Sequence, residues 1–116
     1  MNWTPLENEA QLEKIRQESE THPVLLFKHS TRCSISSAAL ARLERKWDQS
    51  RLGTLKPYYL DLITFRSLSG RIAGDFSVQH QSPQVLLISR GKCVYHASHF
   101  DIGFEDLQQQ VSSLES

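Results

Sequence analysis

The chain has 116 residues, and its 13 basic residues balance 13 acidic ones, so the formal charge is zero. A domain of this size can bury a hydrophobic core without metal ions or disulfides, and we expect one domain over residues 1–116. Because no broad electrostatic field favours nucleic acid or an anionic membrane, we expect neither as a partner.

The start of the chain and its cysteines indicate the compartment. The N-terminal residues carry neither the basic region nor the apolar run that export or membrane anchoring requires. The two cysteines, Cys33 and Cys93, make a poor disulfide framework. These features predict a cytoplasmic protein, in which a cysteine is either a small core hydrophobe or a reactive thiol.

The first predicted elements are a helix, a strand and a second helix. Apolar residues at roughly helical spacing surround the start signal Thr4-Pro5, which predicts an amphipathic helix from that point. The apolar run 24–27 is typical of a strand covered on both faces, and we expect it to be central. The second helix should begin at or next to Cys33, with Ser30 or Thr31 as its cap. Its predicted core stripe consists of Ile35, Ala39, Leu40, Leu43 and Trp47.

The rest of the chain predicts a strand, a helix, a hairpin and a last helix. The strand covers 58–62, the helix 65–76, the hairpin strands 85–88 and 93–97, and the last helix 104–114. A strand-helix-strand unit requires a parallel pair of strands, and the hairpin adds antiparallel ones. We therefore expect an α/β, thioredoxin-like fold, with a four-stranded mixed sheet flanked by helices and an extra N-terminal helix.

Cys33 lies where the predicted central strand passes into a helix through a short polar loop. Helix N–H groups point outward at such a place, and together with the helix dipole they stabilise a thiolate. Lys28, His29 and Arg32 can add positive charge nearby. A thiolate at an exposed helix start attacks disulfides, whereas a buried cysteine is inert. The polar residues that flank Cys33 favour the reactive thiol.

Ser36 stands where a dithiol motif, Cys-x-x-Cys, has its second cysteine. A serine cannot resolve a mixed disulfide. Two interpretations stay open: Ser36 donates a hydrogen bond to the Cys33 thiolate, or it is simply a favourable first-turn residue. A site with one thiol must finish turnover with an outside thiol, which indicates a low-molecular-weight thiol as co-substrate.

Two known families share parts of this pattern. Residues 24–36 and 81–85 resemble the active-site strand, cysteine helix and cis-proline hairpin of thioredoxin-like proteins. More closely, residues 28–36 and 96–102 resemble the monothiol bacilliredoxin family, cytosolic proteins that act on mixed disulfides between proteins and bacillithiol. The resemblance implies that Cys33 accepts bacillithiol from a modified protein.

The same resemblance implies that Pro83 is cis and faces Cys33. We expect the catalytic residues to be Cys33 and Ser36. We expect the residues that bind the substrate or the small thiol to be Lys28, His29, Arg32, Ser82 and Pro83.

Monothiol glutaredoxins are also similar, in Lys28 and in the spacing of Cys33 and Ser36. Their Cys-Gly-Phe-Ser motif is Cys-Ser-Ile-Ser here, and their glycine-rich pattern that holds glutathione has no counterpart around residues 90–101. These departures disfavour glutathione and iron-sulfur binding, and we expect no metal. A glutaredoxin-like iron-sulfur carrier remains an alternative function.

Three further side chains have more than one interpretation. Cys93 should pack as a small hydrophobe rather than resolve a disulfide. Cys93, His96 and His99 are of metal-ligand type, but strand alternation places His96 on the opposite face from the other two, which disfavours zinc. His29 is either a base for Cys33 or a solvated loop histidine, and the second interpretation is slightly favoured.

The leading hypothesis is a thiol-disulfide oxidoreductase. In it the Cys33 thiolate removes bacillithiol or a similar small thiol from protein mixed disulfides, so its partners are thiolated proteins and a low-molecular-weight thiol. The rival hypothesis is a non-catalytic, thioredoxin-fold peptide-binding or adaptor protein. In that case backbone groups at Gln81 and Ser82 dock an extended peptide, and Cys33 is dispensable.

Overall fold

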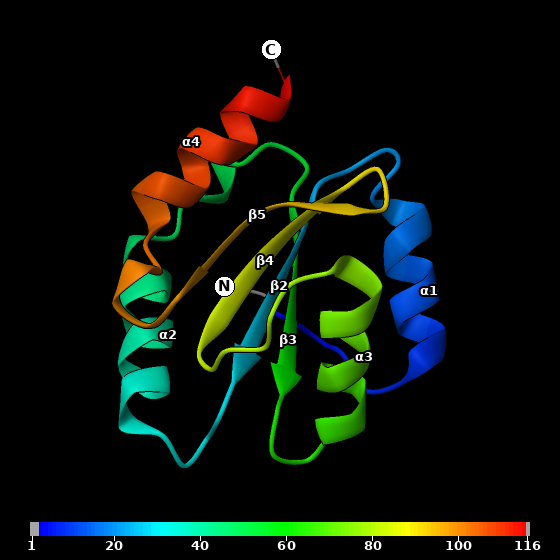
Figure 1. Ribbon diagram of the computed structural model, residues 1–116. Helices are drawn as coiled ribbons and strands as arrows, with labels where there is room; N and C mark the ends of the chain where they lie inside the picture. Colours follow the sequence, from blue (N-terminus) through cyan, green and yellow to red (C-terminus); the bar gives the residue numbers. More distant parts are fainter. Residues whose placement is uncertain (1–2, 116) are drawn as a thin grey trace.

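The computed structural model describes residues 3–115; the predicted domain 1–116 also includes residues 1, 2 and 116, which lie outside the described residues. In chain order the elements are β1 (Thr4–Pro5), α1 (Glu9–Glu18), β2 (Val24–His29), α2 (Ser34–Lys46), the 3-10 turn η1 (Gln49–Arg51), β3 (Lys56–Asp61), α3 (Arg66–Phe76), β4 (Gln84–Ser89), β5 (Lys92–Ser98), the 3-10 turn η2 (His99–Asp101) and α4 (Phe104–Glu115). Figure 1 shows one twisted sheet with helices on both sides.

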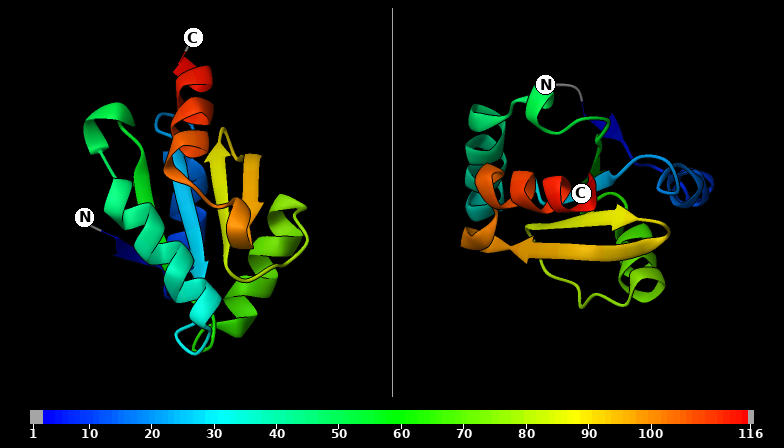
Figure 2. Two further views of the ribbon diagram at one scale, coloured as in Figure 1. Left: turned by 90° about the vertical axis from the view of Figure 1, so that its left-hand side faces the viewer. Right: turned by 90° about the horizontal axis from the view of Figure 1, so that it is seen from above.

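The sheet has five strands in the order β1-β3-β2-β4-β5, and β2 lies at its centre, as predicted. Strand β3 runs parallel to β2, whereas β4 is antiparallel to both β2 and β5. Helices α2 and α4 cover one face of the sheet, and α1 and α3 cover the other (Figures 1 and 2). The predicted α/β class and mixed sheet are therefore confirmed.

Strand β2 separates two hydrophobic clusters, because all six of its residues are buried and successive side chains point to opposite faces. Leu26 belongs to the cluster beneath α1 and α3, and Phe27 to the cluster beneath α2 and α4. The alternation continues to the end of the strand. Lys28 and His29, although adjacent in sequence, therefore leave the sheet on opposite faces.

The N-terminal helix begins later than predicted. Residues 4–5 form the edge strand β1, which pairs in parallel with residues 58–59 of β3 and gives the sheet a fifth strand. Helix α1 begins at Glu9, where the Asn8 side chain accepts a hydrogen bond from the Gln11 backbone N–H at 2.9 Å. The side-chain cap at Asn8 therefore sets where the helix begins, although apolar residues at helical spacing precede it.

Helix α2 begins at Ser34 with Cys33 as its cap residue, which confirms the predicted start next to Cys33. The predicted caps at positions 30 and 31 are wrong, because the loop stays non-helical as far as Cys33. The prediction is also wrong for Ile35, which was placed in the core stripe but is 42% exposed. The next residue, Ser36, lies about 100° further round the helix than Ile35. It points inward and is fully buried.

The remaining elements begin and end close to their predicted bounds. Strand β3, helix α3, the β4–β5 hairpin and helix α4 all match a predicted element. The hairpin turn holds Gly91 at φ 75°, a left-handed conformation that glycine adopts without a Cβ penalty. Within residues 3–115, no helix is both long enough and apolar enough to cross a bilayer.

Candidate active site

Cys33 is half-buried at the start of α2 and forms no disulfide. Its backbone is extended, and its carbonyl accepts the first hydrogen bond of the helix, from the Ser37 N–H at 3.0 Å. The first N–H groups of a helix have no partner within it, and they carry the positive end of the helix dipole. The Cys33 side chain lies at this end of the helix and forms no capping hydrogen bond with it.

Ser36 points away from solvent and binds the loop that precedes Cys33. Its Oγ accepts a hydrogen bond from the Ser30 backbone N–H at 3.0 Å and lies 2.6 Å from His29 Nδ1. The side chain therefore joins the end of β2, the loop and the first turn of α2. This arrangement adds a third possibility to the two open interpretations of Ser36: it holds the cysteine loop in place.

His29 is 5% exposed, so the favoured interpretation of a solvated loop histidine is wrong. The reason is that β2 extends to His29, which pairs with Asp61 of β3. Burial lowers the pKa of His29 and outweighs the attraction of Asp61 for the charged ring. The ring is therefore mainly neutral near pH 7, with Nδ1 at hydrogen-bond distance from the Ser36 hydroxyl.

Lys28 lies on the opposite face of the sheet and is completely buried. Its Nζ donates to the Ser69 carbonyl at 3.2 Å and lies 3.3 Å from His80 Nδ1. Burial lowers the pKa of Lys28 to about 8, which leaves the amine mostly protonated at pH 7. Burial, followed by repulsion from Lys28, lowers the pKa of His80, so its neutral ring can accept from the amine.

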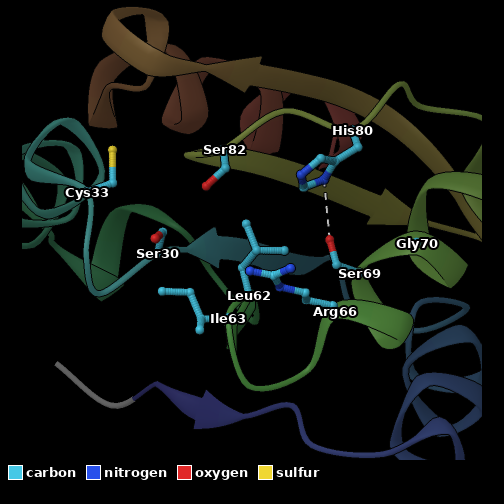
Figure 3. Close-up of a pocket in the computed structure, with 9 residues that line it drawn as sticks. All are labelled: Ser30, Cys33, Leu62, Ile63, Arg66, Ser69, Gly70, His80 and Ser82. Carbon is cyan, nitrogen blue, oxygen red and sulfur yellow. Dashed lines mark hydrogen bonds between the residues drawn. The ribbon is translucent and has the colours of Figure 1, made fainter.

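A pocket of about 660 Å³ opens beside Cys33. In Figure 3 Cys33 lies at one end, His80 and Ser69 lie at the other, Ser82 lies between them, and the Arg66 guanidinium points into the space between the two ends. The lining residues are Ser30, Cys33, Leu62, Ile63, Arg66, Ser69, Gly70, His80 and Ser82.

The loop before β4 forms the wall opposite the cysteine. The Ser82–Pro83 peptide bond is cis, as the resemblance implied. The Pro83 carbonyl accepts a hydrogen bond from the His99 N–H at 3.1 Å, which ties the loop to η2. The Ser82 hydroxyl is buried and has no hydrogen-bond partner among the described residues. Ser82 itself lines the pocket, so an unsatisfied polar group lies at the wall of the site.

The structure brings only part of the expected set into the pocket. Cys33 and Ser82 line it directly, and Lys28 reaches it through Ser69 and His80. His29 and Ser36 lie behind the cysteine loop, and Arg32 is exposed outside the lining.

Sequence reasoning missed the residues that α3 and the following loop contribute, chiefly Arg66, Ser69 and His80. No motif marks them, because none is close to Cys33 in sequence. A partial signal existed in Arg66 itself, a cation in the first turn of a helix, where the dipole favours an anion.

Cys93 lies at the other end of the sheet from Cys33. It pairs with Ile88 of β4, which pairs with Val24 at the beginning of β2, whereas Cys33 follows the end of β2. The length of β2 alone separates the two cysteines by about 16 Å, far beyond the reach of a disulfide. Its sulfur donates to the Tyr95 carbonyl, and Cys93 packs against the cluster beneath α1 and α3.

The residues that the structure describes contain no cluster of three or more His, Cys, Asp or Glu side chains able to hold a metal ion. His96 pairs with Leu86 in β5, and His99 belongs to η2.

The structure combines a mixed sheet with a single cysteine at the start of the helix that follows the central strand. A loop with a cis proline lies across the pocket from this cysteine. Together these features define a thioredoxin-fold protein with a monothiol site. Solved structures agree with this fold. One described as a candidate oxidoreductase with a thioredoxin fold is 31% identical, with a TM-score of 0.79, and the match covers 94% of this chain and 92% of the other.

Two thioredoxins share the fold at much lower identity. The thioredoxin of Malassezia sympodialis is 10% identical, with a TM-score of 0.76 and coverage of 99% of this chain and 92% of the other. The thioredoxin of Trypanosoma brucei brucei is 14% identical, with a TM-score of 0.75 and coverage of 98% and 91%. The family model described as monothiol bacilliredoxin BrxC matches residues 4–107, and the chain belongs to this family.

Proposed function

We propose that this protein removes bacillithiol, or a similar small thiol, from protein mixed disulfides. The Cys33 thiolate attacks the sulfur of the small thiol, and the protein thiolate leaves and takes a proton from water. One disulfide bond breaks as another forms, so the small thiol is now joined to Cys33. A second molecule of the small thiol then attacks this adduct, which releases the symmetrical small-thiol disulfide and restores the Cys33 thiolate.

The observation that carries the proposal is the isolation of Cys33 at the start of α2. The position of a resolving cysteine is occupied by Ser36, and Cys93 lies at the far end of the sheet. An internal disulfide therefore cannot complete the reaction, and an external thiol must. Membership of the monothiol bacilliredoxin family supports a thiol-based system, and bacillithiol as the co-substrate is the specific form that we propose.

We assign the supporting residues different tasks. Ser36, with His29, holds the loop that presents Cys33, and exposed Arg32 adds positive charge near the thiolate. On the other side, Ser82 lines the wall against which the mixed disulfide lies, and the cis peptide bond to Pro83 sets the path of this loop. We place the reaction in the cytoplasm, where small thiols keep cysteines reduced.

The test uses a substrate protein that carries bacillithiol on its cysteine. After incubation with the reduced protein, intact-mass spectrometry should show that the substrate loses the bacillithiol mass and that Cys33 gains it. Cys33→Ser should abolish the transfer, and the matched variant Cys93→Ser should retain it. Transfer at the wild-type rate by Cys33→Ser, or a substrate that keeps its bacillithiol, would contradict the proposal.

A further inference from the structure

The pocket beside Cys33 carries positive charge without a matching acid. None of its lining residues is an aspartate or a glutamate. Arg66 is exposed and points into the pocket in Figure 3, and its side chain forms no ion pair or hydrogen bond with another residue between 3 and 115. Arg71, the second arginine of α3, instead forms ion pairs with Glu9 and Asp75.

A second cation lies directly behind the pocket wall. The Lys28 amine is bonded to Ser69 and His80, which both line the pocket, and no carboxylate within the described residues lies within ion-pair distance of it. A buried cation is ordinarily paired with an anion. Arg66 lies at the pocket and the Lys28 amine lies behind its wall, so an anion that entered the pocket would be attracted by both charges.

The size and the walls of the pocket suit a small molecule attached to Cys33. Its volume of about 660 Å³ lies within the range of small-molecule sites. Leu62 and Ile63 supply an apolar wall. At Gly70 a Cβ would meet nothing within 4 Å, so this part of the wall is open.

We propose that this pocket binds the carboxylate-bearing end of a low-molecular-weight thiol whose sulfur is joined to Cys33, and that Arg66 binds the carboxylate. Lys28, through Ser69 and His80, adds charge from behind. The inference rests on the proposed function and adds a chemical class to it: the site selects an anionic small thiol over neutral and cationic ones. Arg66 is the residue that determines this specificity.

Three small disulfides of similar length test the proposal: anionic 3,3′-dithiodipropionate, neutral 2-hydroxyethyl disulfide and cationic cystamine. In each case the Cys33 thiolate attacks one sulfur, forms the Cys33 mixed disulfide and releases one small thiolate. The rate constant is measured by intact mass in a Cys93→Ser background. Each rate constant is divided by that of the same disulfide with free 2-mercaptoethanol, because the three leaving thiols differ in pKa and so in intrinsic reactivity. We expect the corrected order anionic, neutral, cationic, and we expect the anionic preference to shrink at high salt.

Arg66→Gln should lower the ratio of the anionic to the neutral rate constant about tenfold, the effect of one charged hydrogen bond. The matched variant Arg71→Gln removes the same charge from the same helix outside the pocket, and it should leave the ratio unchanged. Equal rates for the three disulfides, or an equal effect of the two arginine variants, would overturn the inference while leaving the proposed function intact. The absence of a Cys33 adduct with every disulfide would instead contradict the proposed function.

A pair of glycine variants locates the binding site independently of charge. Gly70→Met puts a side chain into the pocket, whereas Gly74→Met makes the same change one turn later, outside the lining and also in open space. Both changes replace a helix-destabilising residue, so both variants should fold. Gly70→Met should slow the reaction with dithiodipropionate several-fold, and Gly74→Met should not. Equal rates for the two variants would show that the thiol lies elsewhere.

Discussion

Ser36 Oγ lies 2.6 Å from His29 Nδ1 and also accepts the Ser30 backbone N–H. The hydroxyl has a single proton, so its partners decide where that proton goes. When His29 carries its ring proton on Nε2, Nδ1 accepts a hydrogen bond from the Ser36 hydroxyl. Ser36 Oγ then donates to His29 and accepts from Ser30, so it links the end of β2 to the loop. Ser36, which occupies the position of a resolving cysteine, therefore supports the cysteine loop from a buried site.

Replacing Ser36 by alanine should destabilise the protein. The change leaves His29 Nδ1 and the Ser30 N–H without a partner in a buried site, and we expect the free energy of unfolding to fall by about 2 kcal/mol. Urea denaturation measures the change. Ser37→Ala, at an exposed position of the same helix turn, is the control and should have little effect. Equal stabilities of the two variants would show that the buried hydrogen bonds contribute nothing.

The stability of the protein should rise with pH above neutrality because of Lys28. Its folded-state pKa of about 8 lies below that of an unfolded lysine, so between these values the unfolded chain binds more protons than the native protein. Raising the pH through this window therefore favours the folded state. From pH 7 to 9.5 the wild type should gain about 2 kcal/mol in the free energy of unfolding relative to Lys28→Met.

This second prediction is checked by urea denaturation of both proteins across that pH range. The comparison with Lys28→Met matters because the raised pKa of Tyr58, which is caused by burial and by Glu18, acts in the opposite direction at high pH in both proteins. A difference between the two proteins that stays constant with pH would contradict the buried, titrating amine.

Alkylation should distinguish the two cysteines. Burial raises the pKa of Cys93, so little of it is thiolate at pH 7, whereas Cys33 lies at a helix start on the wall of an open pocket. We expect iodoacetamide at pH 7 to modify Cys33 at least about tenfold faster, since the thiolate is the reacting species. Peptide mapping by mass spectrometry measures both rates. Faster modification of Cys93 would contradict the assignment of Cys33 as the reactive thiol.

Removing the Trp3 side chain should destabilise the edge of the sheet. Its ring lies 5.7 Å from the rings of Phe27 and Trp47, and its indole N–H donates to Glu44. Trp3→Ala should lower the free energy of unfolding by about 2 kcal/mol, less than for a fully buried tryptophan. Thermal unfolding measures the loss. Phe100→Ala is the control because Phe100 is 79% exposed, and an equal loss there would contradict the prediction.

Local signals predicted most of the elements and missed those that depend on a distant partner. The apolar run before Lys28 predicted a strand, and the periodic apolar residues after Cys33 predicted a helix, each from neighbouring residues alone. The two-residue strand β1 exists only because β3 lies beside it, so no local pattern predicted it. The burial of His29 likewise depends on its pairing with Asp61.

The sequence by itself determined that Cys33 begins a helix after a central strand and has no cysteine at position 36. These are properties of neighbouring residues, which patterns of hydrophobicity and capping record. Only the tertiary structure decided what surrounds the thiol. Arg66, His80 and Ser82 come from segments that meet Cys33 because β3 and β4 flank β2. Strand alternation then sends Lys28 to the side of α3 and His29 to the side of α2, which separates the charge behind the pocket from the support behind the cysteine loop.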